Sequence, residues 1–217
     1  MAGRIEDALR LPGALAAGVF TPDGRLLEFQ SHAPELSAEL GSLGARFAAA
    51  GTLVLATLAA GFERLSGQRW NPVERWIGVG GDFVTHVGDG CFALLDLGKA
   101  RAALPGGPVH TFAQALALPG AADVGDSLPD GRLLEHRSRI GLSDELAAVS
   151  TRFSHDVTAV LRGLAGAFSA AADLDFLPLH AWSYSGGDWT TVVARGRWVL
   201  FERDRAGLAE VLRLAQP

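Results

Sequence analysis

The sequence has one cysteine, one lysine and no uninterrupted apolar run of about 18 residues, and each shortage excludes a class of protein. Cys91 has no partner for an internal disulfide, and thiolates cannot assemble a metal cluster. Lys99 is the only lysine among 19 basic residues and the net charge is -5, so we expect no nucleic-acid partner. No membrane-spanning helix is predicted. The acidic residues near Met1 do not fit a secretory leader, and a cytoplasmic location is expected.

Recognisable catalytic chemistry is also missing. There is no Gly-x-Ser-x-Gly elbow and no Ser/His/Asp set. Cys91 lies in an apolar run, which favours a buried, inert thiol. The sequence therefore predicts a protein that is not an enzyme and has no cofactor and no metal. The six histidines show no metal-ligand spacing: His32, His86, His110, His136, His155 and His180.

An internal repeat dominates what is present. The heptapeptide Pro-Asp-Gly-Arg-Leu-Leu-Glu occurs at 22–28 and again at 129–135. Further along, Trp76 matches Trp182 with the spacing shortened by one residue, which indicates a deletion near 139–141. The chain is therefore a tandem duplication. We assign the first module to 1–105 and the second to 109–217, joined by a Pro/Gly cluster at 105–108.

Each module is predicted to contain eight elements in the order α-β-β-α-β-β-β-α. The segment Pro22-Asp23-Gly24 favours a hairpin turn, because Pro presets the first turn angle and Gly accepts a positive φ. Pro34 is expected to open the long helix, since Pro is favoured at the first helical position. In the first module the other elements are expected as a helix at 4–11, strands at 14–20, 25–30, 75–79, 83–87 and 91–95, and a helix at 98–104.

The long helix is apolar on more than one side. Leu53 and Leu55 lie off its main apolar stripe, and a helix that is apolar nearly all round is covered on two sides. We expect its own sheet on one side and a neighbouring helix on the other. The main stripe, with spacings of three, four or seven, is Leu36, Leu40, Leu43, Phe47, Val54, Leu58, Phe62 and Leu65.

This order and four short motifs resemble the roadblock/dynein light-chain domain family, in an uncharacterised prokaryotic branch. The second copy departs from the pattern, with Ala171-Ala172-Asp173 in place of Leu65-Ser66-Gly67. The motifs are Leu11-Pro12-Gly13, Pro22-Asp23-Gly24, Leu65-Ser66-Gly67 followed by Trp70 and Pro72, and Gly80-Gly81-Asp82. Roadblock domains pair edge to edge with their long helices side by side. The resemblance therefore implies an α+β, two-layer fold: an intramolecular pseudo-dimer with one continuous ten-stranded antiparallel sheet and two long helices on one face.

The resemblance also implies a function, namely a non-enzymatic protein-interaction module that acts as a regulator or scaffold. Its partner by family analogy is a small Ras-like GTPase. Trp70, in a predicted loop with Arg69 and Asn71, is the candidate partner contact, because aromatic residues are enriched at interface hot spots. Core packing is the alternative for Trp70, as for the other tryptophans. Whether fused chains pair further is left open.

Two glycine-rich features suggest an alternative, a small-ligand sensor. Glycines of the long helix could leave a pocket between sheet and helices, although close helix packing explains them as well: Gly41, Gly44, Gly51 and Gly61. The segment 78–90 is glycine-rich too, but its spacing fits neither nucleotide-binding fingerprint, so we interpret these glycines as turns. Asp82 and Asp188 are either turn aspartates or a symmetric acidic pair.

Overall fold

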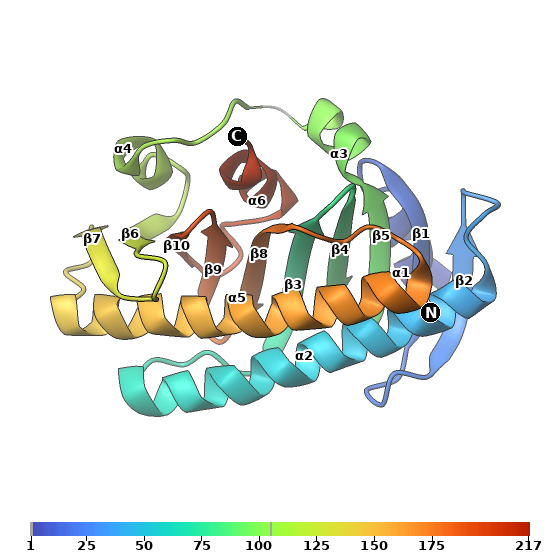
Figure 1. The fold of residues 1–217 in the computed structure, drawn as a ribbon, viewed down its shortest axis with the longest axis horizontal. Helices are drawn as coiled ribbons and strands as arrows, with labels where there is room; N and C mark the ends of the chain where they lie inside the picture. The colour runs from blue at the N-terminus through green and yellow to red at the C-terminus, as the bar shows by residue number, and fades with distance from the viewer. Residues whose placement is uncertain (1, 105) are drawn as a thin grey trace.

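The computed structural model describes residues 2–104 and 106–217, so Met1 and Pro105, at the predicted module boundaries, lie outside the described residues. Both modules have the predicted order of elements (Figure 1). The first contains α1 (Ala2–Leu9), β1 (Ala14–Phe20), β2 (Leu26–Ser31), α2 (Ala38–Ser66), β3 (Val73–Gly80), β4 (Phe83–Gly88), β5 (Cys91–Asp96) and α3 (Leu97–Ala103). The second contains α4 (Phe112–Leu116), β6 (Ala121–Ser127), β7 (Leu133–Ser138), α5 (Asp144–Ala172), β8 (Leu179–Gly186), β9 (Trp189–Ala194), β10 (Arg197–Glu202) and α6 (Leu208–Ala215).

All ten strands form one sheet, in the order β2-β1-β5-β4-β3-β8-β9-β10-β6-β7. Neighbouring strands are antiparallel throughout. The predictions of an α+β fold and of a continuous ten-stranded antiparallel sheet are therefore confirmed. The sheet is continuous because β3 of the first module pairs with β8 of the second.

The seam between β3 and β8 is nearly symmetric. Ile77 faces Ser183, its counterpart in the second copy, while Trp76 faces Tyr184 and Gly78 faces Trp182. An approximate two-fold axis therefore passes between Ile77 and Ser183. Each module contributes its third strand to the centre of the sheet, and its first hairpin forms one outer edge.

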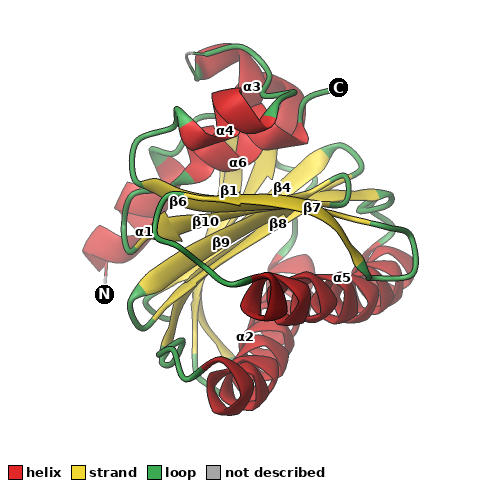
Figure 2. Ribbon diagram, turned by 90° about the vertical axis from the view of Figure 1, so that its left-hand side faces the viewer, coloured by secondary structure: helices red, strands yellow, loops and turns green. Residues whose placement is uncertain are grey.

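The helices cover both faces of the sheet (Figure 2). The long helices α2 and α5 lie side by side on one face, and α1, α3, α4 and α6 lie against the other. Two aromatic stacks join the long helices in a symmetric manner. Phe47 stacks on Phe168 with ring centroids 4.7 Å apart, and Phe62 stacks on Phe153 at 4.6 Å. The same stack of two phenylalanine rings thus occurs once on each side of the axis.

Three details of the predicted long helix are wrong. The helix begins at Ala38 rather than at Pro34, because the Ser37 hydroxyl accepts a hydrogen bond from the Leu40 N–H at 3.3 Å and caps the first turn. Leu65, placed on the buried stripe, is 74% exposed. Of the two leucines off the stripe, Leu55 is 1% exposed but Leu53 is 69% exposed, so only one of them is covered.

The buried face of α2 consists mostly of small residues, because rings from the sheet fill the space opposite them. A Cβ on Gly41 would lie 2.6 Å from the Phe29 ring, and one on Gly51 would lie 2.6 Å from the Trp76 ring. The helix can therefore approach the sheet closely only where its side chains are absent or short. The buried residues are Gly41, Ala45, Ala48, Ala49, Gly51, Leu55, Ala59 and Phe62.

Candidate functional site

The two Gly-Gly-Asp turns join the modules. Gly81 donates its N–H to the Pro178 carbonyl at 3.1 Å, and Asp82 donates to the Asp175 carbonyl at 3.3 Å. A Cβ on Gly81 would lie 1.9 Å from that Asp175 oxygen, so only glycine allows this approach. These glycines are turn residues, as interpreted from the sequence, and they also admit the backbone of the other module.

The same contact recurs on the other side of the axis. The Asp188 N–H donates to the Arg69 carbonyl at 3.1 Å, and a Cβ on Gly187 would lie 2.1 Å from that oxygen. The Asp188 carboxylate lies 3.3 Å from the Arg69 guanidinium. This aspartate therefore forms an ion pair across the interface. Among the described residues, no group of three or more His, Cys, Asp or Glu side chains could hold a metal.

The loop at 69–71, predicted to contact a partner, mostly contacts other residues of the same chain. Trp70 is 3% exposed and stacks on Tyr184, whose hydroxyl donates a hydrogen bond to the Trp70 carbonyl. Trp70 therefore packs in the core and cannot reach a partner without movement of this loop. Arg69 is exposed and Asn71 is partly buried.

Glu63 of α2 holds this loop in place. One of its carboxylate oxygens accepts hydrogen bonds from the backbone N–H groups of Trp70 and Asn71, both at 2.7 Å. The bonds from Asn71 and Trp70 stabilise the charged form and lower the Glu63 pKa. In the second module, the Ser169 hydroxyl accepts the Phe176 N–H at 3.0 Å in the equivalent place. A helix side chain thus fixes each interface loop.

The cavity beside Gly41 and Gly44 is too small for a metabolite. It lies at the α2 end nearest β1 and β5, and its volume is about 20 Å³, which is close to the space of one water. The glycines expected to leave room are covered instead: Phe29 lies against Gly41, and Phe92 lies against Gly44. The alternative of close packing, left open from the sequence, is what the structure shows for these two residues.

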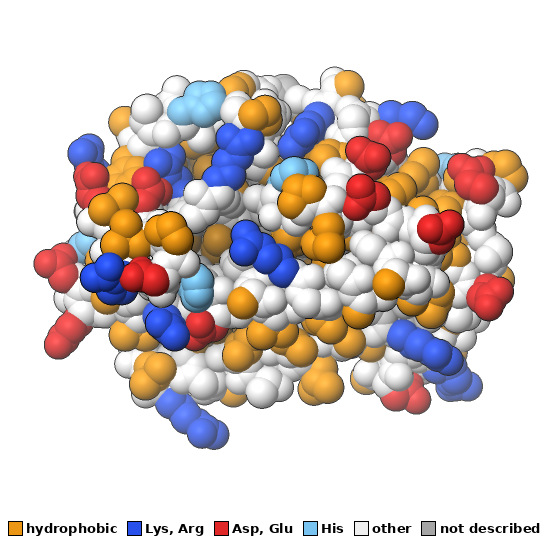
Figure 3. Space-filling model, viewed as in Figure 1, with side chains coloured by type: hydrophobic (Ala, Val, Ile, Leu, Met, Phe, Trp, Pro, Cys, Tyr) orange, Lys and Arg blue, Asp and Glu red, His pale blue; other side chains and the backbone are white. Residues whose placement is uncertain are grey.

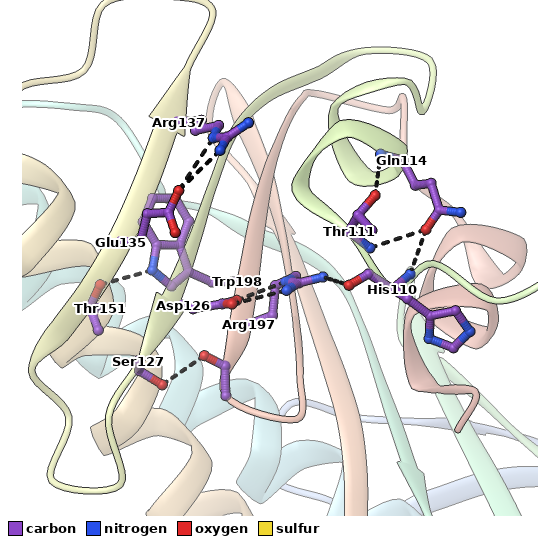
Figure 4. Close-up of polar contacts among 11 residues, drawn as sticks. His110, Thr111, Gln114, Asp126, Ser127, Glu135, Arg137, Thr151, Arg197 and Trp198 are labelled. Atoms are coloured by element: carbon purple, nitrogen blue, oxygen red, sulfur yellow. Dashed lines mark hydrogen bonds and ion pairs between the residues drawn. The ribbon is translucent and has the colours of Figure 1, made fainter.

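The second module contains a polar cluster around Arg197 that is fully used in packing (Figure 4). The Arg197 guanidinium donates to both carboxylate oxygens of Asp126, at 2.7 and 2.9 Å, and to the His110 carbonyl at 2.8 Å. It also lies 4.9 Å from the centre of the Phe112 ring. These contacts attach the segment before β6 to β10. Because the donors and acceptors satisfy one another, we assign this cluster to the fold.

Two buried titratable groups have shifted pKa values. Asp123 of β6 is fully buried, and neither carboxylate oxygen has a hydrogen-bond partner among the described residues. Burial raises its pKa, against smaller opposing effects of Ser138 and His136. Cys91 is 8% exposed, and burial raises its pKa to about 11. The prediction that this thiol is buried is confirmed, and at neutral pH it is not the nucleophilic thiolate.

The outward side of α2 exposes apolar residues that neither the sheet nor α5 covers. We define the α2 outer face as the exposed stripe Leu53, Thr57, Gly61 and Leu65, which recur at every fourth position. No charged residue occurs between Arg46 and Glu63. Figure 3, viewed as Figure 1, shows hydrophobic side chains along the lower band where α2 lies. A groove of about 350 Å³ runs beside Leu53, between α2 and the sheet.

The equivalent stripe of α5 is less apolar in bulk. Ala159 and Ala171 occupy the positions of Leu53 and Leu65, and both are exposed. The expectation that the long helix is covered on two sides overlooked this face. Spacing alone does not point to it, because twelve residues are about three and a third turns of an α-helix, which places Leu53 and Leu65 about 120° apart around the axis.

Of the described residues, only α2 forms a helix long and apolar enough to cross a membrane by length and composition. In the structure, 33% of its most apolar window is buried. Core helices of soluble proteins meet the same criterion, so this result assigns no membrane role.

Comparison with known protein families matches the chain twice, over residues 4–103 and 112–216, to a family described as "Uncharacterized conserved protein (DUF2173)". No curated protein and no solved structure matches the chain. The double match supports the tandem duplication read from the sequence. It does not link the chain to roadblock domains, so that resemblance stays a prediction. The two matches cover most of the chain, which therefore belongs to the DUF2173 family and carries two copies of its domain.

Proposed function

We propose that this protein is a non-enzymatic interaction module that binds another protein through the α2 outer face. The observation that carries the proposal is the exposure of Leu53 and Leu65 on α2, with Leu53 on the uncharged stretch between Arg46 and Glu63. Contiguous exposed apolar residues next to a groove are typical of interaction sites. Burying one leucine side chain contributes about 1.5–3 kcal/mol, so the two leucines supply a large part of the affinity of a transient complex.

The arrangement of the two modules supports a single binding face per chain. In the proposed roadblock-type pseudo-dimer, the stacks Phe47–Phe168 and Phe62–Phe153 already satisfy the inner sides of both long helices. The outer side of α2 is therefore not needed for pairing within the chain. Because α5 carries alanines at the equivalent positions, the matching stripe of α5 offers a partner less apolar surface than the α2 outer face does.

The roadblock resemblance supplies the proposed partner class, a small Ras-like GTPase, and the proposed role of regulator or scaffold. It does not identify a pathway. The proposed location is cytoplasmic, where such a partner would be available.

The test compares wild type with a Leu53→Gln/Leu65→Gln variant, using Ala159→Gln/Ala171→Gln in α5 as the matched control. Proteins retained from an extract of the native host are identified by mass spectrometry, and the strongest one is purified and titrated against all three forms. We expect binding by wild type and the control and at least about a tenfold loss in the leucine variant. No retained protein, or equal affinity for all three, would refute the proposal. Sedimentation of the purified chain checks whether the occupant is a second copy.

A further inference from the structure

A polar cleft of about 590 Å³ lies on the face of the sheet opposite α2 and α5. Its floor is formed by β3, β4, β5 and β8 near the seam. One wall comes from α1, and the other comes from Arg203 and Asp204 between β10 and α6. The volume falls within the range of small-molecule sites, roughly 300–1,000 Å³. It opens on the other face of the sheet from the groove beside Leu53, although Glu74, Gly88 and Asp89 line both.

The polar floor occurs only in the first module. Arg75 and His86 point into the cleft, whereas their counterparts in the second module are the buried residues Ala181 and Val192, covered by α6. The two copies therefore differ in cover as well as in sequence, because α6 lies over Ala181 and Val192 whereas Arg75 and His86 line the open cleft. Both side chains are thus within reach of a ligand in the cleft.

Arg75 is the main cation of the floor and is only partly neutralised. Its guanidinium donates to the Ala206 carbonyl at 3.1 Å and to the Ser185 hydroxyl at 3.5 Å, and the carboxylate of Asp204 is 4.0 Å away. Its side chain is 31% exposed, so it retains access to the cleft. On the opposite wall, Arg4 donates to the Asp89 carbonyl and has no carboxylate within ion-pair distance among the described residues. Arg203, by contrast, is paired with Glu74.

His86 and Ser185 add neutral hydrogen-bonding groups beside Arg75. His86 makes no hydrogen bond to any described residue, and burial together with the charge of Arg75 lowers its pKa to about 4. The imidazole is therefore neutral at pH 7, with one donor and one acceptor. The buried Ser185 hydroxyl accepts hydrogen bonds from Thr190 at 2.9 Å and from Arg75 at 3.5 Å, and neither bond uses its own proton.

We propose that this cleft binds a small oxyanion, a carboxylate or a phosphate, held by Arg75 and Arg4 with hydrogen bonds from His86 and Ser185. Hydrogen bonds from a guanidinium to a carboxylate or a phosphate are charge-assisted, and they are stronger than hydrogen bonds between neutral groups. Acidic residues line the remaining walls: Asp7, Glu74, Asp89 and Asp204. They outnumber the three arginines that line the cleft, so an anion is favoured there only where it lies directly against Arg75 or Arg4.

The experiment titrates the full chain with sodium phosphate, with succinate and with chloride at matched ionic strength, and follows the imidazole NMR signals. The His86 signal is assigned from its loss in His86→Gln. We expect a saturable His86 shift with phosphate or succinate beyond that caused by chloride, and the tighter of the two identifies the class. Equal shifts with all three anions would overturn the proposal, as would no shift.

Variants then locate the site. We expect Arg75→Gln to weaken binding at least about tenfold, whereas Arg132→Gln, an exposed arginine of the second module, leaves it unchanged. The double variant Arg75→Ala/His86→Val carries the residues of the second copy and is expected to fold. It should lose binding in calorimetry while keeping the wild-type circular dichroism spectrum. Binding retained by this folded double variant would exclude the cleft.

Discussion

The stacked pair Phe62–Phe153 allows a direct measurement of how strongly the two modules hold each other. Phe62 is 3% exposed on α2, Phe153 is partly buried on α5, and their ring centroids are 4.6 Å apart. We expect Phe62→Ala to destabilise the protein by about 3–5 kcal/mol and Phe153→Ala by somewhat less. If the rings interact as described, the double variant falls short of the sum by about 0.5–1.5 kcal/mol.

The assay is equilibrium unfolding in urea, followed by tryptophan fluorescence and by far-ultraviolet circular dichroism. The pair Phe47–Phe168, its symmetry mate at 4.7 Å, should give a similar coupling energy. The crossed pair Phe62 and Phe168 is the control. Phe168 lies fifteen residues beyond Phe153 on the same helix, which is roughly 22 Å, so its coupling to Phe62 should be close to zero.

This reasoning is refuted if the destabilisations caused by Phe62→Ala and Phe153→Ala simply add in the double variant. The coupling energy of the stacked pair would then be no larger than that of the crossed control. Two separate unfolding transitions in wild type would also contradict it. A sheet that continues from β3 into β8 should instead unfold as one cooperative unit.

Three further predictions concern single residues. Asp123→Ala should stabilise the protein by about 1–3 kcal/mol at pH 7, because it removes a buried carboxylate without a partner. Burial raises the pKa of Asp123 in the folded protein above its ordinary value of 3.8, so ionisation of this carboxyl opposes folding. The stability gained by Asp123→Ala should therefore shrink as urea unfolding is repeated at pH values falling toward 3.8, and a gain that does not depend on pH contradicts this. Native Cys91 should resist Ellman's reagent at pH 8 and react once unfolded, since its pKa is raised to about 11; fast native labelling would show an open site. Gly81→Val should destabilise by more than about 2 kcal/mol, since φ is +51° and a Cβ would lie 1.9 Å from a carbonyl oxygen of the other module. Gly61→Ala, with nothing within 4 Å, should stabilise by about 0.5–1 kcal/mol in the same assay, and equal effects at the two glycines would argue against the close approach.

The duplication made the order of elements predictable, because each turn and strand signal occurs twice. The start of α2 was missed since two helix-start signals, Pro34 and Ser37, lie three residues apart, and the hydroxyl of Ser37 caps the helix. The buried face of α2 was missed for a different reason. Periodicity assumes that large side chains are buried, whereas here Phe29 and Trp76 come from the sheet and fill the space beside glycines.

The candidate sites were harder to predict than the fold. Trp70 lies in a loop by sequence, but its ring is buried because Phe153 and Tyr184 of the second module pack against it. Arg75 and His86 have no characteristic spacing, and only the topology brings them into one cleft. The available signal was a comparison of the copies, which places Ala181 and Val192 at these positions.

Fusion of the copies changes which substitutions the seam between β3 and β8 can tolerate. In a homodimer every substitution near the axis appears twice and must tolerate its own image. Here Tyr184 lies across from Trp76, while the mirror position is held by Gly78 opposite Trp182. A bulky ring therefore needs room on one side only, and the two sides can specialise independently at any protein concentration.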